Sequence, residues 1–279
     1  MPINDKTTRI EVFKAFSTFF SSVIIASASI IVTLKYNEQQ FAITQKQAES
    51  QLEITRIKEI SALIPKLGAE NANERKFSAI TLSLYGESAV PALIATLGDE
   101  NATVRDASSK ALVLIGEPAI RELKIAFEDR RNSDDLRALS IYTLVLLKAD
   151  ETLQLAIRAV EDASENKFVR KDAATAIGKL RDARGIPALL NATQSTTNAA
   201  LVENSVWALG EIGKKEVNQK LISLLHHQSD RVRVQVVWGL AKLKDENTES
   251  ILLDVIKRDV NKDVRDAATN AIEWMKVSS

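Results

Sequence analysis

Residues suited to catalysis or metal binding are few in this chain. His226 and His227 are its only histidines, and adjacent residues on a helix point about 100° apart, so the two rings poorly share one metal ion. Asp230 is the nearest carboxylate, and we expect it to cap a helix that opens at Arg231. The chain has no cysteine, which excludes thiolate nucleophiles, thiolate zinc sites and disulfides. P-loop, nucleophile-elbow and zincin motifs are also missing. The sequence therefore predicts a protein that is not an enzyme, with no metal ion and no cofactor.

Aromatic residues support a more specific hypothesis, which concerns binding. Tyr142, Trp207 and Trp238 each stand directly before a small or short residue that is followed by Leu or Ile. In a repeating array, equivalent places lie on one face, so we expect Trp207 and Trp238 side by side on the second helices of adjacent repeats. Neighbouring exposed aromatics are typical anchors for a partner chain. The alternative is that both indoles pack between repeats as ordinary core.

The spacing of these aromatics follows an internal repeat. Residues 62–86 and 92–116 are identical at 13 of 25 positions when offset by 30 residues. The same pair of a small and an aliphatic residue then recurs every 31 to 33 residues as far as Ala271 and Ile272. Such periods indicate a solenoid, in which stacked helix pairs share one continuous core. With only 9 glycines and 5 prolines in the chain, we predict an all-α fold: an α-solenoid of about seven helix pairs over residues 59–279.

An arginine recurs near the start of most second helices. One interpretation is a basic ladder for phosphate or an acidic peptide. The other, which we favour, is that each arginine bonds acidic or carbonyl groups of the turn before it. The arginines concerned are Arg75, Arg105, Arg137, Arg170, Arg233 and Arg265.

Two segments carry a family resemblance. VPALIATLGDENATVRDASSKALVLIGE and SVWALGEIGKKEV resemble HEAT repeats, specifically the short HEAT-like type also found in phycobilisome lyases. The resemblance implies a helical solenoid, which in most such proteins is a binding scaffold. We therefore predict a membrane-tethered, non-enzymatic scaffold that binds an unidentified protein or peptide partner on its concave face. The alternative is an enzyme accessory, or a lyase-like or chaperone-like factor, that handles a small molecule.

The balance of charges bears on the kind of partner, and a long apolar segment near the N-terminus bears on the location of the protein. Lys and Arg together number 37, as do Asp and Glu, so the sequence argues against a nucleic-acid partner. Residues 15–34 read AFSTFFSSVIIASASIIVTL and carry no charge. A helix of this length is long enough to cross about 30 Å of hydrocarbon. We predict an N-terminal tail over residues 1–14, a single transmembrane helix over residues 15–34 and a helical stalk over residues 35–58, which Pro65 should end or kink. A cleaved signal peptide and a buried core helix are the alternatives.

The predicted span has features that bear on its packing and orientation. Its small and hydroxyl residues recur at helical spacing, which permits close helix approach in lipid and hence a homo-oligomer or pairing with another membrane protein. The alternative is that the hydroxyls bond their own backbone. Lys6, Arg9 and Lys14 precede the span whereas Lys35 and Lys46 follow it, which favours a cytoplasmic N-terminus and non-cytoplasmic repeats. The packing residues are Thr18, Ser22, Ala26, Ser29 and Thr33.

Overall fold

The computed structural model describes the backbone of residues 5–195 and 197–277, and the side chains from Ile10 onward within those ranges. Every regular element in these residues is a helix. The chain divides into two compact units, residues 1–59 and residues 60–279. Lys6 and Arg9, on which the predicted orientation partly depends, lie outside the described side chains.

The described part of the first unit, residues 5–59, is one uninterrupted helix. Helix α1 (Asp5–Leu63) begins within the predicted tail and continues through the predicted span and stalk, so no change of secondary structure marks those boundaries. One window of this helix, near the N-terminus, is long and apolar enough to cross a bilayer, with a mean hydropathy of 2.0 and no part of it buried. Length and composition of this kind are shared by membrane spans and signal sequences.

The second unit begins at Ile60, in the last turn of α1. A 3₁₀ turn, η1 (Ile64–Gly68), follows α1 and carries Pro65 near its start, so the proline stands just beyond the helix end as predicted. From there, pairs of helices repeat to the C-terminal end of the described chain, and the prediction of seven pairs is confirmed for these residues. The second helices are α2 (Ala72–Leu84), α4 (Ala102–Ile115), α6 (Asp134–Leu146), α8 (Lys167–Leu180), α10 (Ala199–Ile212), α12 (Asp230–Leu243) and α14 (Lys262–Val277).

The first helices are shorter, and several are flanked by 3₁₀ turns. Ile60–Leu63 and η1 serve as the first helix of the first pair. The others are α3 (Val90–Ala95), α5 (Ile120–Glu128), α7 (Thr152–Glu161), α9 (Ile186–Ala192), α11 (Asn218–Ser223) and α13 (Thr248–Arg258).

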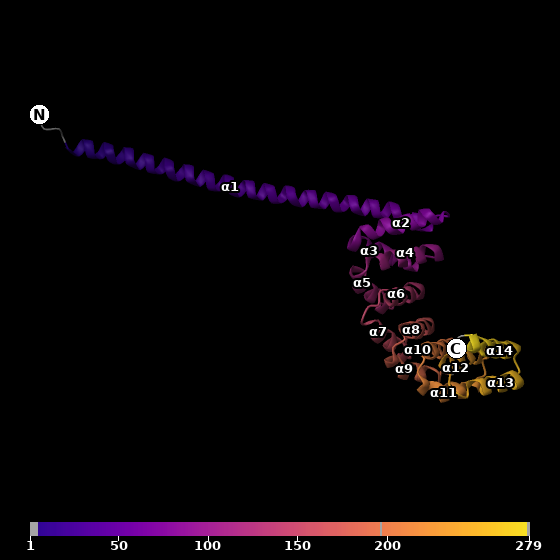
Figure 1. Cartoon of the computed structure of the whole chain (residues 1–279). Helices are drawn as coiled ribbons and strands as arrows, with labels where there is room; N and C mark the ends of the chain where they lie inside the picture. Colours follow the sequence, from indigo (N-terminus) through magenta and orange to yellow (C-terminus); the bar gives the residue numbers. More distant parts are fainter. Residues whose placement is uncertain (1–4, 196, 278–279) are drawn as a thin grey trace. The chain divides into compact units, whose positions relative to one another are not determined.

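Stacking of the pairs produces a continuous apolar core. One cluster of buried residues extends from Ile60 to Leu243, and a second, smaller cluster lies between α12 and the last pair. Consecutive second helices pack directly on one another, for example α8 on α10 and α10 on α12. Within this unit, α10, α12 and α14 lie on the inner side of the curve, whereas α9, α11 and α13 lie on its outer side (Figure 1). The second helices therefore form the concave layer.

Glycines allow two of these helix contacts to be unusually close. A Cβ atom at Gly178 would lie 2.7 Å from both Ala208 Cα and Trp207 Cζ3. A Cβ atom at Gly210 would lie 2.9 Å from Gly239 Cα. Because backbone atoms cannot move aside as a flexible side chain does, α8, α10 and α12 reach this separation only with glycine there.

The recurring arginines bond carbonyl groups that precede their helices, which agrees with the interpretation that we favoured. Arg105 Nη1 donates to the carbonyl oxygens of Asp99 (2.7 Å) and Glu100 (3.0 Å), and Arg75 and Arg265 repeat this pattern in their own turns. The prediction that Asp230 caps the following helix is wrong. Ser229, rather than Asp230, is the N-cap of α12, and Asp230 is the first residue of the helix.

Candidate binding surface on the second helices

The three aromatic residues singled out from the sequence all lie on second helices. Tyr142 of α6 is 37% exposed, whereas Trp207 of α10 and Trp238 of α12 are half-buried. Trp207 packs against the main core and Trp238 against the smaller core of the last pair. Each indole therefore contributes to packing and also presents an accessible part at the concave layer.

The ring neighbour of Trp238 is not the one expected. Its centroid lies 6.5 Å from that of Trp274 of α14, at an interplanar angle of 75°, which is the edge-to-face arrangement that aromatic quadrupoles favour. Lys244 Nζ lies 5.5 Å from the centroid of Trp274. Among the described residues we find no ring contact between Trp207 and Trp238. The expectation that Trp207 and Trp238 anchor a partner side by side stays a prediction, and Trp274 adds a third indole to this layer.

A hollow lies between α6 and α8, beside Tyr142. Its volume is about 270 Å³, and most of its wall is apolar. Lys179 of α8 places Nζ 5.2 Å from the centroid of the Tyr142 ring, a cation–π contact that joins the two helices. The hollow is lined by Ala138, Leu139, Tyr142, Asp172, Thr175 and Ala176.

Asp172 gives this hollow an unusual carboxyl group. Burial raises the pKa of Asp172, and the negative charges of Asp134 and Asp135 raise it further, while Lys171 at 3.0 Å opposes them. A carboxyl group with a perturbed pKa at the wall of a hollow is a recognised feature of functional sites. Sequence reasoning missed it because Asp172 is one of 37 acidic residues, and its desolvation arises from helix packing.

A second hollow adjoins the first on the concave layer. Its volume is about 230 Å³, and Thr175 lines both hollows. Thr175 Oγ1 donates to Asn204 Oδ1 (3.0 Å), which fixes α8 against α10 at the boundary. We call the two depressions the twin hollows. The second is lined by Thr175, Lys179, Glu203, Asn204, Trp207 and Gln235.

Ion pairs hold the helices around the twin hollows in place. Glu211 of α10 accepts hydrogen bonds from Arg181 (2.8 Å), just after α8, and from Lys242 of α12. Burial alone would raise the pKa of Glu211, but these two cations hold it below its usual value. Three consecutive helix pairs are thereby cross-linked at one carboxylate.

The residues predicted to pack the membrane helix lie on α1. Ser22 and Thr33 each donate to the carbonyl oxygen four residues earlier at 2.8 Å, as does Thr18 at 2.9 Å. Ala26 and Ser29 are exposed on the same helix. The hydroxyl groups thus have partners within their own backbone, and their role between helices stays a prediction.

Histidine geometry gives no indication of a metal centre. No group of three or more His, Asp or Glu side chains that could hold a metal ion is found in the described part of the chain. His227 Nδ1 accepts a hydrogen bond from the Ser229 backbone N–H (3.1 Å), so this ring has a local partner.

Comparison with known families gives the repeats their class. Residues 186–273 match HEAT repeats, and residues 169–195 match the PBS lyase HEAT-like repeat. These segments are HEAT-like repeats. Asp172, Thr175 and Lys179 of the twin hollows lie within the second match, and Trp207 and Trp238 lie within the first.

Individual proteins resemble parts of this chain. The chain is 31% identical over 121 residues to the uncharacterized phycocyanin operon protein Y of Pseudanabaena tenuis, a match that covers 42% of this chain and 28% of the relative. A structure of Kap95p bound to RanGDP resembles 81% of this chain at 17% identity, with a TM-score of 0.52, and 37% of that chain is covered. The CpcE–CpcF complex of phycocyanin lyase from Nostoc sp. PCC7120 matches 66% of this chain and 98% of that chain, at 24% identity and a TM-score of 0.37.

The comparisons bear unequally on the two functions predicted from the sequence. The match to the PBS lyase HEAT-like repeat and the relative from a phycocyanin operon agree with the alternative, an accessory or lyase-like factor, better than with a membrane-tethered scaffold. At 17% identity, the resemblance to Kap95p concerns the fold alone.

Proposed function

We propose that this protein is an accessory factor of the lyase type, which binds a linear tetrapyrrole, or the protein that carries one, at the twin hollows. The observation that carries the proposal is the juxtaposition of Tyr142, Trp207 and Lys179 with Asp172 on one concave layer. The match of residues 169–195 to the PBS lyase HEAT-like repeat supports it, because this segment contributes to both hollows.

The chemistry of the hollows suits such a ligand. A linear tetrapyrrole has a flat, conjugated body with N–H donors and carboxylate side chains. Tyr142 and Trp207 supply aromatic walls, Lys179 supplies a cation for a carboxylate, and Asp172 supplies an acceptor for N–H groups. Each hollow is smaller than a typical pocket of about 300–1,000 Å³, so an extended molecule that spans both fits better than a compact one.

Titration with biliverdin, a linear tetrapyrrole, tests the proposal. Binding in a chiral site should induce visible circular dichroism in biliverdin and quench tryptophan fluorescence. Trp207→Ala should weaken binding by about tenfold, as loss of a buried aromatic anchor does. Ile125→Ala removes an exposed residue of α5 in the first-helix layer and is the matched control. Absence of an induced signal, or equal effects of the two variants, would contradict the proposal.

A membrane-tethered scaffold is the second candidate. The apolar, unburied window of α1 favours it, since an uncovered surface of this kind needs a bilayer or another chain around it. In this function, the second-helix layer binds a protein or peptide partner through Tyr142, Trp207 and Trp238. Substituting both tryptophans with Ala should weaken capture of that partner while helicity and melting temperature hold, whereas a large loss of either would assign the indoles to the core.

Protease protection tests the tether and its orientation. Sealed, right-side-out vesicles would carry the full chain with a tag after Ser279. Degradation of the tag by added protease places the repeats outside the cytoplasm, and protection places them inside. A tag released into the soluble fraction would mean cleavage near Ala28 and would exclude the anchor.

A further inference from the structure

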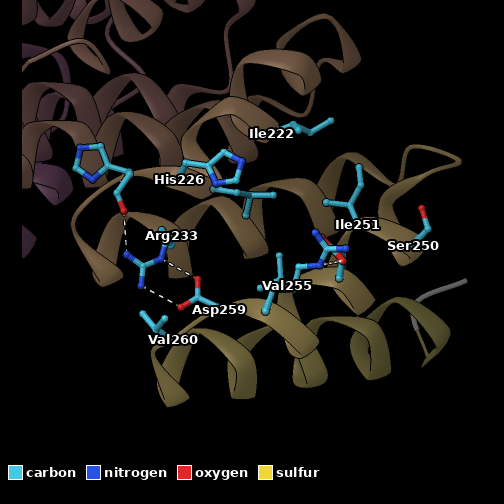
Figure 2. Close-up of a pocket in the computed structure, with 12 residues that line it drawn as sticks. Ile222, His226, Arg233, Ser250, Ile251, Val255, Asp259 and Val260 are labelled. Atoms are coloured by element: carbon cyan, nitrogen blue, oxygen red, sulfur yellow. Dashed lines mark hydrogen bonds and ion pairs between the residues drawn. The ribbon is translucent and has the colours of Figure 1, made fainter.

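A second kind of cavity lies away from the concave layer, at the last helix pair. It is a cleft of about 590 Å³ between α13 and the segment formed by α11 and η7 (Leu224–His226). We call it the C-terminal cleft. Figure 2 shows Ile222 and His226 on one side of it, with Ile251 and Val255 of α13 on the other.

The cleft coincides with a division in the core. The main apolar cluster ends at Leu243, and a second cluster around Leu252 and Val264 joins the last pair to α12. Helix α13 packs on α14 and α12, and Leu225 of η7 is only partly buried where the two clusters meet. The face of α13 that carries Ile251 and Val255, one helical turn apart, is therefore left partly uncovered.

Size and lining are those of a small-molecule site. The volume lies within the usual range of about 300–1,000 Å³ for ligand pockets. Ile222 and Leu225 form one apolar wall, and Ile251 and Val255 form the other. A ligand must accordingly have an apolar body.

Both carboxylates of the cleft already face an arginine. Asp259 receives hydrogen bonds from Arg233 Nε (2.8 Å) and Nη2 (3.0 Å), and both side chains are nearly buried. Asp254 Oδ1 lies 2.8 Å from Arg258 Nε. The negative charge of the lining is thus neutralised from within the protein, so the cleft offers little to a cationic ligand.

The remaining polar capacity of the cleft includes N–H donors of its histidines. His227 Nδ1 accepts from the Ser229 N–H, which places the proton of the neutral ring on Nε2. Within the described ranges, the His226 ring makes no hydrogen bond to the protein, and it lines the cleft. Imidazole N–H groups beside an apolar wall are suited to an acceptor such as a carboxylate.

We propose that the C-terminal cleft binds a small amphipathic carboxylate, whose apolar body lies between Ile222 and Val255 and whose carboxylate meets His226. This site is separate from the twin hollows and does not depend on the function assigned to them. It is placed on the first-helix side of the last two pairs.

Photoaffinity labelling of the full chain tests this site. The probe is a benzoic acid that carries a para trifluoromethyl-diazirine, and cross-linked peptides are mapped by mass spectrometry. Labelling should concentrate in residues 222–228 and 250–260. Val255→Trp fills the cleft and should reduce labelling there by about tenfold, whereas Leu253→Trp adds the same indole to the exposed side of α13 and should not. Equal labelling of the two variants would overturn the site.

Two further variants of the experiment test the carboxylate. His226→Ala removes an exposed ring and leaves the core intact, and it should reduce labelling by about tenfold if that ring donates to the ligand. The methyl ester of the probe should label the cleft less than the acid does. If the ester labels it as strongly, or if His226→Ala changes nothing, recognition of a carboxylate at His226 is wrong.

Discussion

Arg137 and Glu165 form a two-pronged ion pair between adjacent helix pairs. Nη1 of the arginine lies 2.8 Å from Oε1 of the glutamate and Nη2 lies 2.6 Å from Oε2, while the two side chains are only 4% and 5% exposed. Arg137 Nε also donates to the Phe127 carbonyl oxygen (2.7 Å), and the guanidinium lies over the Phe127 ring. One buried cation therefore holds together the third and fourth repeats.

Glu165→Gln should destabilise the repeat unit by about 3–5 kcal/mol, because it removes the countercharge of a buried arginine. Urea unfolding of the full chain in mild detergent, followed by tryptophan fluorescence, measures the loss. Glu128→Gln is the matched control, since Glu128 pairs with Arg158 at an exposed surface and should matter little.

The effect of Glu165 should depend on pH. Hydrogen bonds from Arg137 hold the pKa of Glu165 below its ordinary value of 4.5, although burial opposes them. A carboxylate with a lowered folded-state pKa stabilises the protein above its unfolded pKa and loses this contribution as pH falls through the folded value. The difference between wild type and Glu165→Gln should therefore be full at neutral pH and shrink below about pH 4. A difference independent of pH would contradict this electrostatic account.

Gly178→Ala should destabilise the stack by about 1–3 kcal/mol, as overpacking of a close helix contact does. The added methyl would lie 2.7 Å from Trp207 Cζ3 and from Ala208 Cα, so α8 and α10 must separate or the indole must turn. Urea unfolding measures the loss, and the emission maximum of Trp207 should shift. Gln154→Ala shortens an exposed side chain of α7, away from this contact, and should leave the unfolding midpoint nearly unchanged.

Asp172→Asn should stabilise the protein slightly at pH 7, by less than about 1 kcal/mol, and should weaken biliverdin binding. Burial raises the folded-state pKa of Asp172 above its ordinary value of 3.8, so the charged form destabilises the folded state at neutral pH. This cost is full above the folded pKa and disappears as pH falls below the unfolded value, where the variant and wild type should unfold alike. A destabilised variant at pH 7 would show that Asp172 has a structural role.

Ser22→Leu combined with Ala26→Leu should abolish self-association of α1 in detergent or in a membrane-association reporter. The bulky side chains would block close approach on the face that carries the small residues. Ser21→Leu is a suitable control, because Ser21 also bonds a carbonyl oxygen of its own helix but lies off that face. If oligomers survive the double substitution, the hydroxyl groups only bond their own backbone and do not pack helices together.

Much of the fold was readable from sequence because a solenoid is built from local, repeated contacts. The recurring small and aliphatic residues specified seven helix pairs, and Pro65 indicated where the first long helix ends. The arginines could also be interpreted correctly, because each bonds carbonyl groups only five to ten residues before it in the chain, as Arg105 and Arg170 do.

The candidate sites depended on contacts between repeats, which no single repeat encodes. Trp238 meets Trp274, which stands outside the repeat position that we compared, so the comparison of repeats could not reveal this contact. Asp172 is desolvated only once α6 and α8 are stacked. The C-terminal cleft lies where α13, packed on α14 and α12, leaves Ile251 and Val255 partly uncovered. The periodic sequence therefore determined the architecture, whereas the tertiary structure decided which side chains meet, because those distances depend on how closely neighbouring helices approach.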